Sequence, residues 1–300
     1  MKTCCVLMST YNGKKYVREQ IDSILHQKDV KISMLIRDDG SQDGTLDILN
    51  EYEKKYSQVK VYVGANCGAC GSFFDLMKNV KKQHDYYAFA DQDDIWLSDK
   101  ISHAISILEK DNTKPALYCG AYKLVDSELK PIGNGKSNKV KPSFGNSLVE
   151  CIYSGCTGVF NKELLELVIR KIPQNAYMHD WWMYMVASAF GKVYCDETPL
   201  MYYRQHDKNV LGGNTGKIRQ TVKRIRNFKK LCSYVPKQII EFGQIFENEL
   251  SREQKLLIKC MTNPKKSPIR RLEIFKQKKI MRCSSFDNFI YKMMFLFWMI

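Results

Sequence analysis

Three carboxylates lie close together in the chain, directly after an apolar run. Residues 87–90 (Tyr-Ala-Phe-Ala) have the pattern of a buried strand, and Asp91, Asp93 and Asp94 follow them at once. Because a charge is costly to desolvate, acidic side chains at a strand end need a partner. A hard divalent ion such as Mg²⁺ binds one or two carboxylates and leaves positions for phosphate oxygens. The spacing indicates metal-assisted handling of a diphosphate, and a solvated acidic turn before a helix is the alternative.

A second acidic pair has a similar setting. Asp38 and Asp39 end another apolar run and precede Gly40 and Ser41. A carboxylate here can accept a hydrogen bond from a nucleobase or a ribose hydroxyl, and the Gly-Ser backbone can face phosphate at a helix start. The alternative is a helix N-cap with Asx-turn chemistry, for which Ser41 and Asp43 are suited. These residues alone leave both interpretations open.

Apolar strands and amphipathic helices alternate through the first half of the chain. We expect strands at 3–9, 32–37, 59–63 and 86–90, and helices at 14–27, 43–56 and around 73–80. Such repeats predict an α/β fold with a doubly wound, mostly parallel sheet flanked by helices, whose ligands bind beyond the carboxyl ends of the strands. Those ends carry the polar turns 9–13, 38–41, 66–68 and 91–94. The turns are expected to line one nucleotide-binding face.

The middle of the chain predicts a strand at 116–125, a polar loop at 130–143 and a turn into a strand at 155–160. A helix at 179–190 and strands at 192–195 and 200–204 follow. Asp180 lies in the first turn of that helix, where the macrodipole alone could explain an acid. Trp181 and Trp182 next to it could pack in a core or form a wall on which a sugar stacks.

Charge divides the 300 residues into two regions. Lys and Arg balance Asp and Glu up to residue 207, and the whole net charge of +15 lies in residues 208–300. We therefore expect a catalytic domain at 1–213 and a basic, mainly helical region at 214–300. A basic region of this kind suits an anionic membrane surface or nucleic acid.

The last residues, 289–300, are almost all apolar. This run is shorter than the roughly 20 residues that span a bilayer, so we favour a helix lying on the membrane surface. Docking on the core or on a second copy of the chain, as a homodimer, is the alternative. The 11 cysteines show no disulfide framework, and the chain begins directly with a strand pattern, so a cytoplasmic setting is expected. Cys67 and Cys70 have redox-motif spacing without the surrounding pattern.

Five strings, in order, resemble one family. They are STYNG at 9–13, DDGSQDGT at 38–45, DQDDIW at 91–96, HDWW at 179–182 and YRQHDKN at 203–209. Together they resemble the family 2 glycosyltransferases with the GT-A fold, above all the bacterial rhamnosyltransferase-like branch that acts in cell-surface polysaccharide synthesis. The resemblance covers about residues 3–213. Ser9 stands where many relatives carry proline, which puts little in doubt.

The resemblance implies a role for each matched residue. Asp180 would be the general base, with Trp181 and Trp182 on the acceptor side. Asp93, Asp91 and His206 would hold Mg²⁺ or Mn²⁺, and Asp94 competes with Asp93 as the direct ligand. His206 could instead be a surface histidine, and Asp38 would support its turn. The residues expected to bind the donor are Thr10, Tyr11, Asn12, Asp39, Gly40, Ser41, Asn66, Asp91, Gln92 and Arg204.

The implied activity is an inverting transfer of a sugar from dTDP-rhamnose or a UDP-hexose to a saccharide acceptor. The acceptor would be lipid-linked through a polyprenyl chain, and the enzyme would work on the inner face of the cell membrane as a peripheral protein. Two other classes remain: a nucleotidyltransferase of similar fold, and a basic nucleic-acid-binding protein. The first turn, 9–13, lacks the basic residue that a triphosphate needs, although Lys14 and Lys15 follow it at once. We find no nucleic-acid-binding motif, so we expect no nucleic-acid partner.

Overall fold

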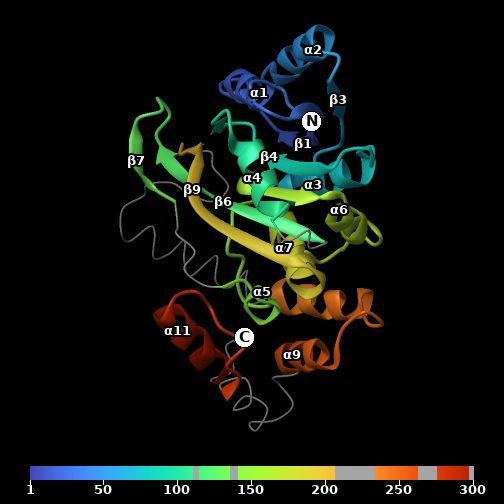
Figure 1. Ribbon diagram of the computed structural model, residues 1–300, viewed down its shortest axis with the longest axis vertical. Coiled ribbons are helices and arrows are strands. Elements are labelled where there is room, and N and C mark those ends of the chain that lie inside the picture. Colours follow the sequence, from blue (N-terminus) through green and yellow to red (C-terminus); the bar gives the residue numbers. More distant parts are fainter. Residues whose placement is uncertain (111–114, 136–140, 207–233, 263–275, 297–300) are drawn as a thin grey trace. The chain divides into compact units, whose positions relative to one another are not determined.

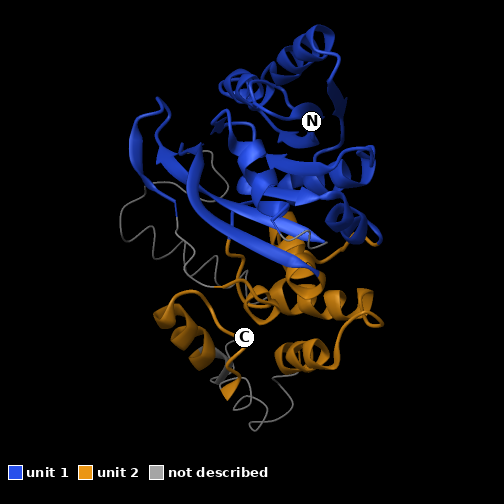
Figure 2. Ribbon diagram, viewed as in Figure 1, with its two compact units in different colours: residues 1–137, 153–170, 191–213 blue, residues 138–152, 171–190, 214–300 orange. Residues whose placement is uncertain are grey.

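The computed structural model describes residues 1–110, 115–135, 141–206, 234–262 and 276–296 (Figure 1). The chain forms two compact units (Figure 2). The first comprises residues 1–137, 153–170 and 191–213 and carries the sheet; the second comprises 138–152, 171–190 and 214–300. Asp180 and the acidic residues 91–94 therefore belong to different units. The functional division at residue 213 stays a prediction.

One mixed sheet organises the first unit. Its strands, in spatial order, are β3 (Val59–Val63), β2 (Lys31–Asp38), β1 (Thr3–Thr10), β4 (Tyr86–Ala90), β8 (Gly158–Asn161), β6 (Ala116–Val125), β9 (Lys192–Arg204) and β5 (Ile95–Trp96), with β7 (Pro131–Asn134) paired to β6. The first four are parallel to one another, and β9 is parallel to β6. β8, β5 and β7 run antiparallel to their neighbours. The predicted α/β fold with a mostly parallel sheet is confirmed.

Alternation along β1 explains how helices come to cover both sheet faces. Cys4, Val6 and Met8 are fully buried and join a core to which helices α1 (Val17–Leu25), α2 (Thr45–Lys55) and α4 (Lys100–Leu108) contribute. On the other side of the sheet are α3 (Gly68–Asn79) and α6 (Lys162–Ile169), where aromatic rings pack in series. Phe73 lies 5.2 Å from Phe89, and Phe89 lies 4.8 Å from Phe160.

The described part of the second unit is helical. It contains α5 (Phe144–Ser147), α7 (His179–Phe190), a helix at 234–245, α9 (Arg252–Thr262) and α11 (Ser285–Leu296). α7 is buried on nearly every side, and Trp182 packs edge-on against Phe242 with ring centroids 5.5 Å apart. A helix apolar all round requires such a position, because water would otherwise face its hydrophobic side chains.

Several predicted elements match the observed bounds: the strands at 59–63, 86–90 and 116–125, and the helix at 179–190. Others differ. The polar loop at 130–143 contains strand β7, and the two strands expected at 192–204 are one continuous strand whose register against β6 shifts twice. Of the basic, mainly helical region expected at 214–300, residues 214–233, 263–275 and 297–300 lie outside the described residues. Among the helices that the structure describes, none combines the length and apolar character needed to cross a membrane.

Candidate active site

The turns after β1 and β2 are joined by hydrogen bonds. The Asn12 N–H donates to the Ser41 hydroxyl at 2.8 Å, and the Gly13 N–H donates to the Thr45 hydroxyl at 2.9 Å. Asn12 has a φ of 48°, which its short polar side chain tolerates. Its side-chain oxygen accepts the N–H of Gln42 at 2.9 Å. The two turns therefore form one connected surface at the carboxyl ends of adjacent parallel strands.

Asp38 supports this surface through hydrogen bonds to the end of β1 and to the turn after β2. Its carboxylate is fully buried and accepts the Thr10 hydroxyl at 2.9 Å. It also accepts the N–H of Ser41 at 2.7 Å and the hydroxyl of Ser41 at 2.6 Å. Gly40, between them, has a φ of 87°, a conformation that glycine adopts without strain. Asp38 thus supports its turn, as the sequence suggests.

Asp39 connects the β2 turn to the start of α3. Its carboxylate pairs with the buried Arg37 guanidinium and accepts the N–H groups of Cys67 at 3.0 Å and Gly68 at 2.9 Å. Burial favours the neutral acid, but the N–H of Cys67, the Arg37 guanidinium and the N–H of Gly68 outweigh it, and the pKa of Asp39 lies below its ordinary value. Asp39 is therefore held ionised next to Asn66, which is exposed.

Gln92 links the loop after β4 to the turn after β1. The Tyr11 N–H donates to Gln92 Oε1 at 2.8 Å, and Gln92 Nε2 donates to the Tyr11 carbonyl at 3.0 Å. The approach is close: a Cβ atom on Gly13 would lie 2.1 Å from Gln92 Oε1. The ring of Tyr11 is half-exposed above this contact. The three loops after β1, β2 and β4 are thereby fixed to one another.

The end of β9 brings His206 to Asp93. Their Nε2 and Oδ2 atoms are 2.7 Å apart, and both side chains are mostly buried. The His206 ring stacks on Tyr16 with centroids 5.1 Å apart, and the Arg204 guanidinium lies over the same ring at 4.4 Å. Arg204 also donates to the Asp93 carbonyl at 2.9 Å and pairs with Glu19. Two of the three predicted metal ligands are therefore in contact.

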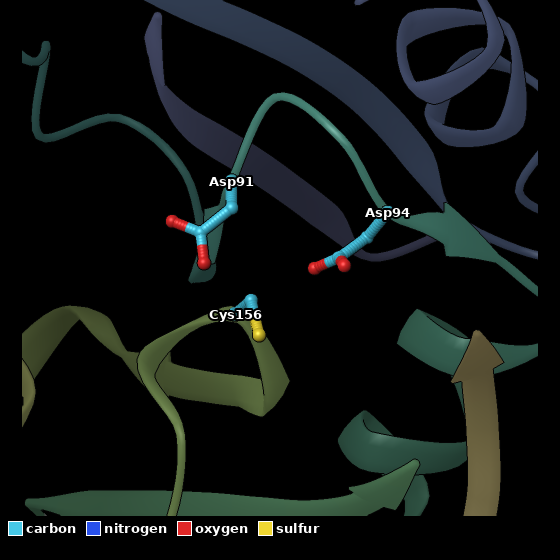
Figure 3. A group of neighbouring side chains, drawn as sticks. All are labelled: Asp91, Asp94 and Cys156. Carbon is cyan, nitrogen blue, oxygen red and sulfur yellow. The ribbon is translucent and has the colours of Figure 1, made fainter. Parts of the chain in front are cut away.

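Asp91, the third predicted ligand, groups with different residues. Asp91, Asp94 and Cys156 each offer a ligand atom, and these atoms lie within 4.8 Å of one another (Figure 3). Asp94 is almost fully buried, and its Oδ1 accepts the Arg204 N–H at 3.2 Å. Burial, together with the charges of Asp93 and Asp91, raises the pKa of Asp94 well above its ordinary value.

Sequence reasoning did not find Cys156 or Lys100. Cys156 lies in a short 3₁₀ turn (Gly155–Thr157) ahead of β8, and only the pairing of β8 with β4 brings it to the acidic loop. Lys100 is buried, with its ammonium 3.4 Å from the centre of the Trp96 ring. Burial lowers the pKa of Lys100 to about 8. No local pattern in the sequence identifies either residue.

Asp180 lies in the first turn of α7, in the second unit. Its Oδ1 accepts the N–H of Trp181 at 2.7 Å. The indole of Trp181 is buried and donates to the Ser147 carbonyl at 2.6 Å, and the indole of Trp182 is fully buried. Both indoles thus pack in the core of this unit. Roles on the acceptor side, and the role of Asp180 as base, stay predictions.

The sheet, its crossover helices and the polar turns gathered at the carboxyl ends of β1, β2 and β4 define a GT-A type of α/β fold. The sequence pattern of the family "Glycosyl transferase family 2" matches residues 5–168. The chain belongs to glycosyl transferase family 2, and it is a glycosyltransferase that uses a nucleotide-sugar donor. The predicted family is confirmed, and neither a nucleotidyltransferase nor a nucleic-acid-binding protein is supported.

Individual relatives agree with this assignment. The chain is 35% identical over 222 residues to the dTDP-rhamnosyl transferase RfbG of Shigella flexneri, which covers 69% of this chain and 74% of that protein. The fold is similar to S. aureus TarS 1-349 in complex with UDP-GlcNAc, with a TM-score of 0.62, 18% identity, and 93% and 76% of the two chains covered. It is also similar to the mannosyltransferase PcManGT from Pyrobaculum calidifontis in complex with GDP-Man and Mn²⁺, with a TM-score of 0.57, 14% identity, and 89% and 71% covered.

Proposed function

We propose that this protein transfers a sugar, with inversion, from dTDP-rhamnose or a UDP-hexose to a saccharide acceptor in the synthesis of a cell-surface polysaccharide. The similarity to a dTDP-rhamnosyl transferase supports the first donor, and the similarity of fold to a protein solved with UDP-GlcNAc supports the second. The observation that carries the proposal is the convergence of the turns after β1, β2 and β4, with the Asp93–His206 pair beside them.

The donor nucleoside is proposed to lie along the turns after β1 and β2. Asp39 accepts a base N–H there, because its carboxylate is held ionised by Arg37 and the start of α3. The exposed side chains of Tyr11 and Asn66 are available at the same edge. Thr10, Asn12, Gly40 and Ser41 shape the pocket, and Asp91 and Gln92 lie toward the ribose. Arg204 acts on the donor through the backbone of Asp93, to which it donates a hydrogen bond.

A divalent ion fits the residues at the β4 loop. The Asp93 carboxylate and the His206 imidazole lie 2.7 Å apart, and Asp91 lies in the same loop. Oxygen and imidazole donors suit Mn²⁺, and oxygen donors suit Mg²⁺. We propose that Asp93, His206 and Asp91 hold this ion. When bound, it would neutralise charge that develops on the departing nucleoside diphosphate.

The transfer needs one proton acceptor, and Asp180 is the proposed base. The acceptor oxygen forms a bond to the anomeric carbon while the bond from that carbon to the phosphate oxygen breaks. The nucleoside diphosphate leaves with the electron pair, and Asp180 takes the hydroxyl proton. Trp181 and Trp182, buried behind Asp180, would fix the position of the helix start from which its carboxylate projects.

The test separates chemistry from donor binding. Asp180→Asn should slow transfer by about 10²–10⁴-fold and leave the Kd of the donor unchanged. Asp287→Asn, in the first turn of α11, is the matched control and should transfer normally. Asp93→Ala should raise the donor Kd in Mn²⁺ and have little effect in a chelator. Near-normal turnover of Asp180→Asn would show that another residue is the base. Thermal shifts with dTDP-rhamnose, UDP-glucose and UDP-galactose in Mn²⁺ identify the donor.

An exposed apolar face on α11 supports action at a membrane surface. Phe286 and Phe289 are 71% and 57% exposed, and Ile290, one position on, is also exposed. Residues three or four apart share one helix face, so these three side chains form a single patch. The same segment carries five basic residues, and Lys279 and Arg282 among them pair with Glu253 and Glu150. The other three are Lys276, Lys278 and Lys292. Apolar insertion with flanking cations is the pattern of a helix that binds anionic lipid.

Flotation with vesicles tests this surface. The protein should bind phosphatidylglycerol-containing vesicles, bind pure phosphatidylcholine vesicles poorly, and lose binding in high salt. Replacing Phe286 and Phe289 together by serine should abolish flotation. Leu256→Ser, at another exposed apolar side chain in α9, is the control and should float normally. If the double variant floats unchanged but loses self-association in solution, the patch is an interface between two copies of the chain instead.

A further inference from the structure

Three potential metal ligands from two chain segments lie close together at the acidic loop, residues 91–94. Asp91 and Asp94 lie at the two ends of the loop between β4 and β5, and Cys156 lies in the 3₁₀ turn before β8. Antiparallel pairing of β4 with β8, with Ala88 opposite Val159, fixes that turn against the loop. One ligand atom of each residue lies within 4.8 Å of the other two, and Figure 3 shows the side chains next to one another.

The carboxyl group of Asp94 provides a second, independent observation. Asp94 is 1% exposed, and its Oδ1 accepts the Arg204 N–H. Its Oδ2 makes no hydrogen bond of ordinary geometry to any residue that the structure describes, and the thiol of Cys156 is a close polar neighbour. In Figure 3 the Asp94 carboxyl group points toward Asp91 and Cys156. A buried carboxylate oxygen without a partner is costly, and a cation would satisfy it.

The ligand set selects the kind of ion. A thiolate is a poor ligand for Mg²⁺, whereas Zn²⁺ readily binds one sulfur together with carboxylate oxygens. The geometry points to a second cation site, formed by Asp91, Asp94 and Cys156, that takes Zn²⁺ or a similar borderline ion. The ion displaces the thiol proton of Cys156. It lies beside the Asp93–His206 pair and shares the acidic loop with it.

Charge balance favours an occupied site. Two carboxylates and a thiolate carry three negative charges, and a divalent ion supplies two positive ones. The third comes from Lys100, which is buried and close enough to interact electrostatically with both Cys156 and Asp94. Its ammonium packs on the Trp96 ring and makes no hydrogen bond to the described residues. The filled site is therefore neutral, with Asp94, Cys156 and Lys100 all buried.

The site has a consequence for catalysis that rests on the proposed function. Asp91 belongs both to this site and to the set proposed to hold the donor's ion. An ion on Asp94 and Cys156 withdraws Asp91 from the donor's ion, so Zn²⁺ should weaken donor binding. The existence of the site does not depend on this consequence, and the measurements below read ion binding without any substrate.

X-ray absorption on the Zn²⁺-loaded full chain counts the sulfur ligands. If the ion lies in this site, the zinc should have one sulfur ligand at about 2.3 Å and oxygen or nitrogen ligands at about 2.0–2.2 Å. Two sulfurs would assign the ion to a cysteine pair instead and overturn the proposal. Candidates among the described cysteines are Cys67–Cys70, of which Cys67 is exposed, and Cys119–Cys195, which are register partners on β6 and β9. A zinc shell without sulfur would overturn the proposal as well.

Cobalt titration then identifies the cysteine. In a Cys67→Ser/Cys70→Ser background, Co²⁺ should produce a thiolate-to-metal charge-transfer band. Cys156→Ser should abolish the band and weaken binding by about 100-fold or more. Cys5→Ser, another buried cysteine in the same sheet, should keep it. If Cys156→Ser does not fold, Asp94→Asn should retain the band with weaker affinity. A band that survives Cys156→Ser would show that another cysteine binds the ion, and no ion binding at all would show that Asp94 and Cys156 form no cation site; either result would overturn the proposal.

Discussion

The turns after β2 and β4 occupy equivalent places, since both strands neighbour β1 and both turns are acidic. In the β2 turn, the buried Asp38 accepts hydrogen bonds from Thr10 and Ser41, and Asp39 is matched by Arg37. In the β4 loop, Asp94 is equally buried but accepts one hydrogen bond of ordinary geometry, from the backbone of Arg204.

The contrast separates carboxylates that are satisfied by hydrogen bonds within the protein from a buried carboxyl group, Asp94, that is not. A charge satisfied within the protein contributes to folding. A charge left unmatched lowers stability, and a bound cation recovers what is lost. The β2 turn is therefore supported by hydrogen bonds within the protein, and the β4 loop is where the ion of our proposals would bind.

The largest expected effect is the difference between Asp38→Ala and Asp94→Asn. Asp38→Ala leaves the Ser41 N–H and the Thr10 hydroxyl without their acceptor, and should lower the free energy of unfolding by about 2–4 kcal/mol. Asp94→Asn replaces a buried carboxyl group, whose pKa is raised, by an amide of the same shape, and should change this free energy by less than about 1 kcal/mol in a chelator. Urea unfolding followed by circular dichroism measures both. If both variants lost the same free energy of unfolding, Asp38 and Asp94 would not differ in how much they stabilise the fold.

A smaller loss of unfolding free energy is expected on changing Arg204, which binds the β4 loop from the end of β9. Arg204 donates to the Asp93 carbonyl at 2.9 Å and the Ser127 carbonyl at 2.8 Å. Lysine keeps the charge but lacks the planar group that reaches both acceptors. Arg204→Lys should therefore cost about 1–3 kcal/mol of unfolding free energy and weaken donor binding.

Arg18→Lys is the control for that variant. Arg18 pairs with Glu51 on the surface, both side chains being about half exposed. Exposed pairs contribute little, so this variant should lose no more than about 1 kcal/mol and bind the donor normally. If the two arginines behave alike in calorimetry, Arg204 does not hold the loop.

The β2 turn and the β4 loop also differ in how much of their structure could be predicted from the sequence. Strand alternation and polar turns located the sheet and the surface after β1, β2 and β4, because neighbouring residues determine these features. The alternative of Asx-turn chemistry before the helix was also open to sequence reasoning, since Asp43 accepts the N–H of Thr45 only two residues on. Cys156 could not be found, because 62 residues separate it from Asp94 and only the β4–β8 pairing brings them together.

The aromatic residues illustrate the same limit. Trp181 and Trp182 follow Asp180 directly, and the sequence left core packing and a sugar-binding wall equally open. Their burial depends on the surrounding helices, as the contact of Trp182 with Phe242 shows. Likewise, the stacking of His206 on Tyr16 joins the end of β9 to the residue before α1. Contacts between distant segments are not encoded in a local pattern.

Opposite pH responses should follow from Asp39 and Asp94. The Asp39 pKa is lowered on folding, so its ionised form stabilises the protein above the ordinary carboxyl pKa of about 4, and this stability is lost as pH falls below it. The Asp94 pKa is raised, so the folded protein holds a proton that the unfolded chain releases, and stability falls as pH rises above about 4. Each slope is at most about 1.4 kcal/mol per pH unit.

Difference curves against Asp39→Asn and Asp94→Asn isolate the two carboxylates. Unfolding free energies measured in a chelator from pH 3 to 8 should show the wild type losing its advantage over Asp39→Asn toward acid. The wild type should also lose stability relative to Asp94→Asn as the pH rises toward neutral. If both differences in unfolding free energy changed in the same direction with pH, the direction of the pKa shift would be wrong for Asp39 or for Asp94.

The smallest expected effect lies where the loops after β1 and β4 touch. Gly13 has no positive φ among the described backbone angles, so alanine is compatible with its conformation. A Cβ at this position would, however, lie 2.1 Å from Gln92 Oε1 and displace the side chain that bonds both backbone groups of Tyr11. Gly13→Ala should therefore cost about 1 kcal/mol, because a flexible side chain can move away but loses those hydrogen bonds.

A double-mutant cycle with Gln92→Ala decides whether that contact is the cause. With Gln92 shortened, the added methyl group meets no side chain at that point. Gly13→Ala should then stabilise the protein by about 0.4–1 kcal/mol, through the lower entropy of the unfolded chain. The sign of the Gly13→Ala effect thus reverses between the two backgrounds, giving an interaction energy of about 1–2 kcal/mol. An equal cost in both would place the strain in the β1 turn itself and not in the contact between Gly13 and Gln92.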